Sequence, residues 1–287
     1  MWIAESVRRN VNPAYIFLTS VKKYADMFNT NKIYSVWDKR LVRGVKNYRR
    51  LAKQTEYKGG RNQERNAKVF SYEDKTTEML NLLGVKNMYP GILEADDVIA
   101  WMTKKLPGDK VVISVDQDML QLVNEKTMVY SPIKDILIDH VNFNDKVGVN
   151  IDQFLRYKSL MGDKSDNLPG IGKCGPKTAK KLVNECVDDQ QLEEKLGHDK
   201  LKPYYHNMEM INLDKGVEHH PDDAKIYQQQ LDDLQEHEPD MHGFENMCDN
   251  MNMKKIVTDI QQWTEAFTDT NLTNTLESIV NNLGLSK

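Results

Sequence analysis

Acidic side chains stand in short motifs at several places along this 287-residue chain. If carboxylates from different motifs converge, protonation or cations must relieve their repulsion, and oxygen ligands select hard ions such as Mg²⁺ or Mn²⁺. Two such ions roughly 3.5–4 Å apart would activate a water molecule and stabilise the leaving oxygen of a phosphodiester. The motifs therefore predict phosphoryl chemistry at two metal ions, with the candidate ligands Asp38, Glu94, Asp96, Asp97, Asp116, Asp118, Asp163 and Asp166.

These acids differ in how easily a structural role explains them. Asp96 and Asp97 open an expected helix, where the macrodipole favours acidic residues without any ligand. Asp116 directly follows the apolar run 111–115, and Asp118 comes two residues later. Because ligands of α/β sheets collect at the carboxyl ends of strands, the sequence favours a functional role for Asp116 and Asp118.

Basic side chains are concentrated between Lys39 and Lys68. This segment holds eleven lysines and arginines against two acids, although the whole chain has a formal net charge of −4. Tyr48 and Tyr57 lie among the charges, as phosphate neutralisation with base stacking requires. A solvated helix face is the alternative that composition leaves open.

The glycine-rich stretch 167–179 is the most specific part of the sequence. Glycines leave backbone amides uncovered, and an expected helix follows whose N-terminal end can hold a phosphate. A loop that merely joins two helices is the alternative, which the nearby lysines disfavour. We expect this hairpin to bind a duplex backbone without reading its sequence, through Gly170, Gly172, Lys173, Gly175, Lys177 and Thr178.

Strand and helix patterns alternate in the first half of the chain. Expected strands at 32–37 and 111–115 alternate with expected helices at 14–28, 73–83 and 95–106, which predicts an α/β core with a mainly parallel sheet. Helical patterns dominate from Ile151 onward. We therefore predict a core domain over residues 1–150, with the basic segment at 39–70, and a helical lobe over residues 151–287.

The last third of the chain carries weaker signals. Between Asp214 and Asp249, eleven acids face two lysines, which predicts a solvated surface turned away from nucleic acid. His219 and His220 lack a third ligand at usable spacing, so we expect a surface pair rather than a metal site. The pattern from Ile256 to Phe267 predicts one amphipathic helix that packs on the core.

Several classes of protein are excluded. No apolar run reaches the roughly 18 residues of a membrane span, and the N-terminus lacks the apolar stretch of a signal peptide. The three cysteines have no CxxC spacing, which argues against a disulfide framework or a zinc site. We expect a cytoplasmic protein.

Taken in order, the motifs resemble those of the flap endonuclease family, specifically the phage and bacterial 5′ nucleases that include phage ribonuclease H and the 5′ nuclease domain of DNA polymerase I. The resemblance runs from about Ile33 to Leu182. Its motifs in this chain are Val36-Trp37-Asp38, Tyr57-Lys58-Gly59-Gly60-Arg61, Glu94-Ala95-Asp96-Asp97, Ser114-Val115-Asp116-Gln117-Asp118 and Met161-Gly162-Asp163-Lys164-Ser165-Asp166-Asn167.

This resemblance implies a PIN-like core with a helical arch and a helix–hairpin–helix lobe. It also implies a 5′-3′ exonuclease and flap endonuclease that removes primers during phage or bacterial DNA replication. Lys58 and Arg61 match arch residues that contact the scissile phosphate, with Lys58 acting electrostatically and Tyr57 as a stacking surface. The first metal would take Asp38, Glu94, Asp96 and Asp116, and the second Asp116, Asp118, Asp163 and Asp166.

The implied partners follow from the same resemblance. They are two Mg²⁺ ions, replaceable by Mn²⁺, and branched or 5′-ended DNA and RNA–DNA duplexes. A single-strand-binding protein or a sliding clamp would be a protein partner, and the chain would be a monomer in the bacterial or host cytoplasm. The balance between RNA and DNA, and between exonuclease and endonuclease action, stays open.

One departure concerns the start of the chain. The family opens with an apolar strand ending in an aspartate that serves the first metal, and nothing before Ala14 fits this pattern. Glu5 lacks the preceding strand, and Asp26 falls inside an expected helix. Residues 2–9 match the segment that follows the strand, so a start codon placed too far downstream is the preferred explanation and a split gene is the second.

Two other functions compete with the nuclease. A primase- or topoisomerase-type acidic fold also combines a glutamate with an Asp-x-Asp strand end, but it explains neither the basic segment nor the hairpin. A catalytically weak, structure-specific DNA-binding protein would keep the hairpin and lack one metal ligand. Cleavage of a 5′-flap duplex that needs Mg²⁺ and is lost in Asp116→Asn would favour the nuclease.

Overall fold

The computed structural model describes residues 12–52, 63–234 and 238–268. They form two compact units, each assembled from separate stretches of chain. The first unit takes its described residues from Met1–Trp37, Gly60–Tyr89 and Gln228–Lys287, and the second takes them from Asp38–Gly59 and Pro90–Tyr227. No helix within the described ranges is long and apolar enough to cross a membrane.

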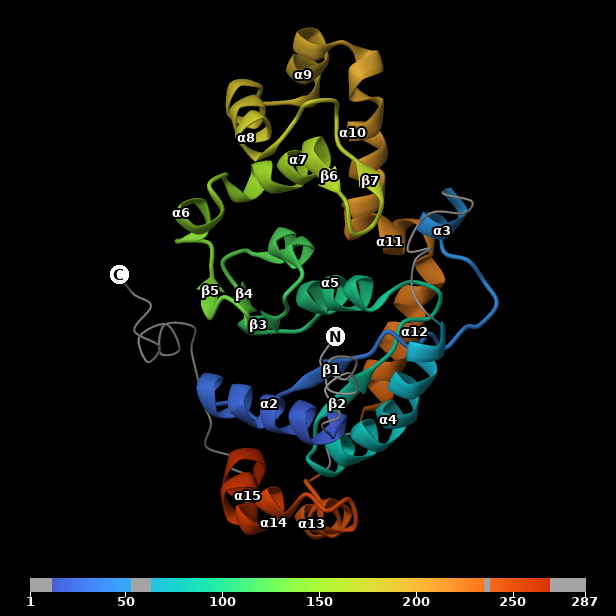
Figure 1. Cartoon of the computed structure of the whole chain (residues 1–287), viewed down its shortest axis with the longest axis vertical. Coiled ribbons are helices and arrows are strands. Elements are labelled where there is room, and N and C mark those ends of the chain that lie inside the picture. Colours follow the sequence, from blue (N-terminus) through green and yellow to red (C-terminus); the bar gives the residue numbers. More distant parts are fainter. Residues whose placement is uncertain (1–11, 53–62, 235–237, 269–287) are drawn as a thin grey trace. The chain divides into compact units, whose positions relative to one another are not determined.

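A parallel strand pair lies in the first unit (Figure 1), where β1 (Tyr34–Val36) pairs with β2 (Lys86–Met88). The indole N–H of the buried Trp37 donates to Asn87 Oδ1 over 2.7 Å. A helical layer packs on a shared apolar core with Leu18, Met79 and Trp263. Its helices are α2 (Pro13–Phe28), α4 (Gln63–Leu82), α13 (Met241–Asn250), α14 (Lys254–Thr258) and α15 (Ile260–Thr268).

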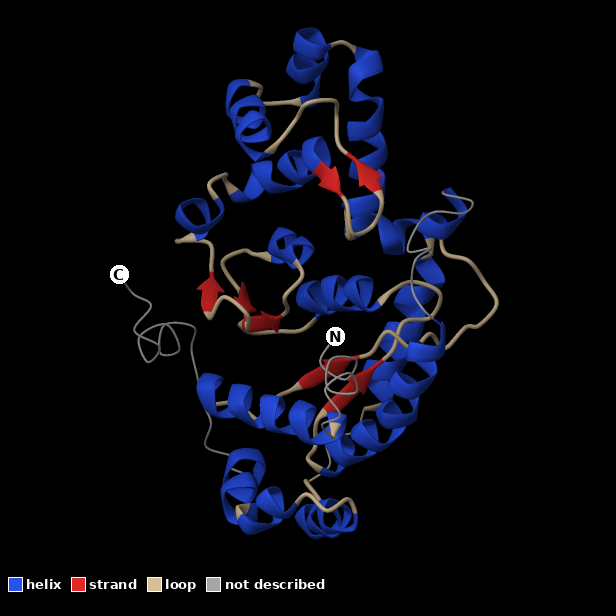
Figure 2. Cartoon of the chain, in the orientation of Figure 1, coloured by secondary structure: helices blue, strands red, loops and turns tan. Residues whose placement is uncertain are grey.

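The second unit contains a mixed three-stranded sheet, shown in red in Figure 2. β3 (Lys110–Ile113) runs parallel to β4 (Thr127–Ser131), which runs antiparallel to β5 (Ile136–Ile138). Helix α5 (Ala95–Lys105) precedes β3, and the 3₁₀ helix η1 (Gln117–Leu122) follows it. The chain thus reaches Asp116 just after the carboxyl end of β3.

Helices make up the rest of the second unit. Helix α7 begins with a capping box between Asn150 and Gln153, and it packs on α8 and α10 around Phe154 and Leu160. The elements are α3 (Tyr48–Ala52), α6 (Phe143–Val147), α7 (Ile151–Met161), β6 (Gly162–Asp163), β7 (Leu168–Pro169), α8 (Pro176–Glu185), α9 (Asp189–Leu196), α10 (His198–Ile211), α11 (Asp214–His219) and α12 (Pro221–Asp233), which continues into the first unit.

The α/β prediction is confirmed by the parallel pairs β1–β2 and β3–β4. Two expectations need correction. The single helix expected between Ile256 and Phe267 is two helices, because α14 ends before Asp259 and α15 starts at Ile260. The acidic segment is folded into α11, α12 and α13 rather than uniformly solvated, and Asp223 within it is fully buried because backbone N–H groups surround its carboxylate.

Candidate functional site

Asp118 and Asp163 approach one ammonium group in the second unit. Asp118 lies on η1 after β3, and Asp163 lies on β6 after α7. Lys158 Nζ is 2.9 Å from Asp118 Oδ1 and 3.1 Å from Asp163 Oδ2. Because the Lys158 side chain is only 8% exposed, one buried cation balances two carboxylates that are distant in sequence.

The pKa values in this group reflect burial and charge together. Burial raises the pKa of Asp118 to about 6 against the attraction of Lys158, and the charge of Asp116 adds to the rise. Burial alone would raise the pKa of Asp163, but the Ser165 hydroxyl, which donates to Asp163 Oδ1 over 2.5 Å, and Lys158 lower it. Burial opposes the charged form of Lys158 as well, yet its two carboxylate partners raise its pKa.

Asp116 completes what we call the lysine-bridged group, which comprises Asp116, Asp118, Lys158 and Asp163. The exposed Asp116 caps η1, since its Oδ1 accepts from the Asp118 N–H over 2.9 Å. Its own N–H donates to Ser114 Oγ over 3.1 Å. The turn after β3 therefore carries Asp116 next to Asp118, and of these two acids it is Asp118 that contacts Lys158.

Lys158 was not predicted from the sequence. It stands with Phe154, Tyr157 and Met161 at helical spacings of three and four residues, so it lies on the apolar stripe of α7. A lysine in that position is seldom buried without acidic partners. That spacing is the signal that could have found it.

Glu94 and Asp97 lie at the start of α5 and pair with arginines. Arg49 Nη1 and Nη2 donate to Asp97 Oδ2 and Oδ1 over 2.7 and 2.9 Å, and Asp97 Oδ2 also accepts from the Glu94 N–H over 3.1 Å. Glu94 is buried, with Oε1 3.7 Å from Arg40 Nη2. Protein donors occupy both oxygens of Asp97, so the metal set that we propose below leaves this predicted ligand out.

The remaining predicted ligands are not brought into a common centre. Asp38 is exposed, and Asp96 and Asp166 are half-buried. Within the described ranges, no three His, Cys, Asp or Glu side chains are arranged to hold a metal ion. Tyr57, Lys58 and Arg61 lie outside the described residues, so their roles stay predictions.

The predicted hairpin, residues 167–179, starts at β7, which pairs antiparallel with β6, and continues through a loop at 170–175 into α8. Its glycines fall into two kinds. A Cβ on Gly170 would lie 2.2 Å from Met161 O, so this glycine permits a close backbone crossing. An added Cβ on Gly172 or Gly175 would meet nothing within 4 Å. Gly175 is the N-cap of α8 and provides no side-chain cap, so this end of α8 presents uncovered amides.

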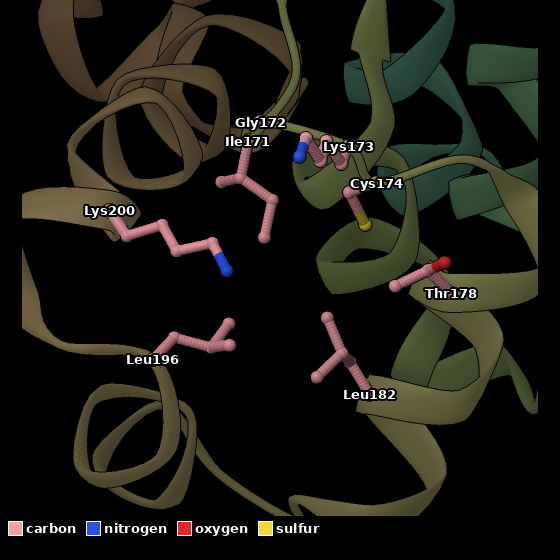
Figure 3. Close-up of a pocket in the computed structure, with 8 residues that line it drawn as sticks. All are labelled: Ile171, Gly172, Lys173, Cys174, Thr178, Leu182, Leu196 and Lys200. Atoms are coloured by element: carbon pink, nitrogen blue, oxygen red, sulfur yellow. The ribbon is translucent and has the colours of Figure 1, made fainter.

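A pocket of about 380 Å³ lies beside the hairpin (Figure 3). Lys173, in the left-handed region at φ 62°, stands at one side, and Lys200 extends into the pocket from α10. The wall is mostly apolar, and the lining residues are Ile171, Gly172, Lys173, Cys174, Thr178, Leu182, Leu196 and Lys200. Two cationic groups thus stand at this pocket, Lys173, which the sequence named, and Lys200, which it did not.

His219 and His220 pack against the base of the basic segment. Tyr48 N–H donates to His220 Nε2 over 3.0 Å, and the Tyr48 ring stacks on His219 with centroids 4.4 Å apart. His219 also pairs with Glu209. Within the described part of the chain, these side chains are not part of a group of three that could hold a metal ion. They hold α3 against the α10–α11 junction.

Two protein-family models match consecutive parts of this chain. The model for the 5′-3′ exonuclease N-terminal resolvase-like domain matches residues 3–148, and that for the 5′-3′ exonuclease C-terminal SAM fold matches residues 149–242. The division predicted at residue 150 stays a prediction, since the compact units are drawn differently.

Curated relatives carry the same name. The 5′-3′ exonuclease of Buchnera aphidicola from Acyrthosiphon pisum is 38% identical over 119 residues, which are 40% of this chain and 41% of the relative. That of Aquifex aeolicus is 40% identical over 111 residues, 38% of each protein. The chain thus spans well under two thirds of these relatives.

Solved structures share the fold. The phage T5 D15 protein co-crystallised with metal ions has a TM-score of 0.66 at 19% identity and covers 81% of this chain and 95% of its own. A complex of T5 D15 flap endonuclease with DNA and metal ions has a TM-score of 0.55 at 18% identity, covering 88% and 91%. Family models match both halves of the chain, and its fold places strand-end acids beside a helix–hairpin–helix. The chain therefore belongs to the 5′-3′ exonuclease family.

Proposed function

We propose that this chain is a structure-specific 5′ nuclease that cleaves phosphodiesters of flap or 5′-ended DNA by a two-metal mechanism. The observation that carries the proposal is the pairing of Asp118 and Asp163 about a single buried ammonium. Two carboxylates with one compensating cation form a site that a divalent cation complements. Family membership supports the reaction class.

The donor set fits hard divalent cations. Its oxygens come from carboxylates, and burial beside other acids raises the pKa of Asp118 to about 6, a penalty that a bound cation relieves. Asp116, Asp118, Asp163 and Asp166 would hold one ion, and Asp38, Glu94, Asp96 and Asp116 the other. When bound, Mg²⁺ or Mn²⁺ supplies water activation and stabilisation of the leaving oxygen. Metal ions in the T5 D15 crystals support a metal-dependent reaction for this fold.

The chain's own residues prepare this site. Lys158 keeps Asp118 and Asp163 near each other by attraction to both. Ser165 fixes one oxygen of Asp163, and the cap of η1 fixes the turn that carries Asp116. These contacts orient ligands before an ion binds, which lowers the ordering cost of the complex.

The hairpin would bind the duplex backbone. Gly172 and Gly175 leave the approach to α8 uncovered, and Lys173, Lys177 and Thr178 are exposed beside it. Uncapped amides at a helix N-terminus together with lysines are suited to phosphate groups and carry no base specificity. The T5 flap endonuclease complex with DNA supports a nucleic-acid ligand.

The arch residues and the cellular role rest on family likeness. Lys58 and Arg61 would stabilise charge on the scissile phosphate, and Tyr57 would stack on a base. The role would be primer removal during phage or bacterial replication, including ribonuclease H action on RNA–DNA duplexes. The chain would act as a monomer, with a single-strand-binding protein or a sliding clamp as its protein partner.

One observation favours a second candidate, a DNA-binding protein with weak catalysis. No group of three metal-binding side chains forms within the described ranges. This candidate would bind flap DNA through the hairpin with little cleavage.

A labelled 5′-flap duplex with Mg²⁺ tests both functions. We expect cleavage that stops with EDTA and falls at least about 100-fold in Asp116→Asn, since loss of a metal ligand removes the charge stabilisation that the ion supplies. Asp152→Asn, an exposed acid on α7, is the matched control. Binding with no cleavage by the wild-type chain would favour the second candidate, and equal cleavage by wild type and Asp116→Asn would contradict the metal set.

A further inference from the structure

Three consecutive backbone amides before α5 donate to buried carboxylates. The N–H groups of Ile92 and Leu93 donate to Asp223 over 3.0 and 2.9 Å. The next N–H, that of Glu94, donates to Asp97 over 3.1 Å. The chain entering α5 is therefore held at each residue from 92 to 94.

Asp223 is an unusual partner for this loop. It comes from α12, is 0% exposed, and no ion pair joins it to a basic side chain in the described part of the chain. Its remaining donor is the Tyr227 hydroxyl at 2.9 Å. A buried carboxylate without a cation is held by its hydrogen bonds, and hydrogen bonds to a charged acceptor are stronger than those between neutral groups.

Glycines occupy positions where the backbone comes close to the two buried acids. A Cβ on Gly91 would lie 2.5 Å from Asp223 Oδ1, so only glycine allows the carboxylate to approach the loop. A Cβ on Gly216 of α11 would lie 2.2 Å from Asp97 Oδ1. The backbone at Gly91 thus approaches Asp223 closely, and the backbone at Gly216 approaches Asp97 in the same way.

The loop ends at a residue of the proposed metal set. Glu94 is the N-cap of α5 in extended conformation, and its side chain is buried near Arg40. Because the amides of residues 92 and 93 are fixed by Asp223, the direction in which Glu94 leaves the backbone depends on an acid on α12.

We propose that Asp223 is a positioning residue for the metal site, acting through the 91–94 loop on the orientation of Glu94. This inference rests on the proposed function, since it takes Glu94 to be a metal ligand. Residues that orient metal ligands without touching the ion change metal affinity by about 10- to 100-fold when replaced.

Asp223→Asn tests the inference in the full chain. The side-chain NH₂ group of asparagine takes the place of one carboxylate oxygen and cannot accept from the N–H groups of Ile92 and Leu93. The loop therefore loses part of its hydrogen bonding to α12. We expect the dissociation constant of Mn²⁺, measured by electron paramagnetic resonance without DNA, to rise about tenfold. The Mg²⁺ concentration for half-maximal cleavage should rise in parallel, while KM for the flap duplex at saturating Mg²⁺ stays unchanged.

Asp222→Asn is the matched control, because Asp222 precedes Asp223 on the same helix, is exposed, and forms an ion pair with Lys225. It should leave Mn²⁺ affinity at the wild-type value. If Asp223→Asn does not fold, Tyr227→Phe keeps the carboxylate and removes one donor, and it should weaken Mn²⁺ binding about two- to threefold.

Glu94→Gln separates this inference from the proposed function. If Glu94→Gln weakens Mn²⁺ binding and the Asp223 or Tyr227 variants do not, the positioning role is wrong and the metal set stands. If Glu94→Gln also binds Mn²⁺ like the wild type, the metal set itself is wrong, and the inference falls with it.

Discussion

Two sets of carboxylates in the second unit are held by basic side chains, and they differ in what holds them. Asp118 and Asp163, 15% and 17% exposed, share the ammonium of Lys158. Asp97, which is 0% exposed, receives the planar fork of Arg49 and a backbone N–H. Lysine offers a point charge, whereas arginine offers fixed paired donors. The first set is suited to exchange its cation for a metal, and the second is suited to fix the backbone.

Loss of Arg49 should have the largest effect on stability. Arg49→Met leaves Asp97 buried without its cation and also removes the bond to the Met210 carbonyl. Breaking such a buried pair costs about 3–5 kcal/mol. Urea unfolding should show this loss equally with EDTA and with Mg²⁺, because the pair is not a metal site.

The exposed pair of Lys225 with Asp222 provides the control. Lys225→Met should change the free energy of unfolding by less than about 1 kcal/mol. If Arg49→Met lowers the free energy of unfolding by as little as this control, or if Mg²⁺ restores the loss, then the carboxylates held by Arg49 and by Lys158 do not differ as we infer.

Loss of Lys158 should have a smaller effect that metal reverses. Lys158→Met leaves Asp118 and Asp163 without their shared cation, and we expect a loss of about 3 kcal/mol in EDTA, at the lower end for broken buried pairs. Excess Mg²⁺ should restore most of that loss, since a divalent ion then compensates the two carboxylates. Thermal unfolding with and without Mg²⁺ measures both quantities, and a loss unaffected by Mg²⁺ would contradict an exchangeable cation.

The pH dependence of stability should report Asp118. Its pKa is raised from 3.8 to about 6 on folding, so the folded chain binds the proton more tightly than the unfolded chain. The stabilising contribution is full below about pH 4 and is lost as the pH rises through 6. We expect a loss of about 2 kcal/mol over that range in EDTA. Asp118→Asn should flatten this part of the curve, and an unchanged slope would show that Asp118 is not the titrating group.

Much of the fold and part of the site could be predicted from local sequence. The apolar run before Asp116 and the helix after Glu94 are patterns of neighbouring residues, and both elements form where expected. The hairpin was predictable for the same reason, although Gly170 serves backbone packing rather than an open amide surface.

The rest depends on contacts between segments far apart in the sequence. Composition placed Asp223 in a solvated acidic surface, because nothing near it in the chain shows that the 92–93 amides reach it. Arg49 was counted with a basic surface that neutralises phosphate, yet it is 3% exposed and bound to Asp97. Charge in a segment indicates a partner, and only the fold decides whether that partner is internal.

The smallest expected effect concerns Ser165, which holds Asp163 within the lysine-bridged group. Ser165→Ala removes the hydroxyl that donates to Asp163 Oδ1, so the lowered pKa of Asp163 should rise toward its ordinary value. A lowered folded pKa contributes stability above the unfolded pKa and loses it as the pH falls through the folded value. We therefore expect Ser165→Ala to be destabilised by about 1 kcal/mol at pH 7 and to match the wild type near pH 2. Equal differences at both pH values would mean that the hydroxyl supports the turn and not the charge of Asp163.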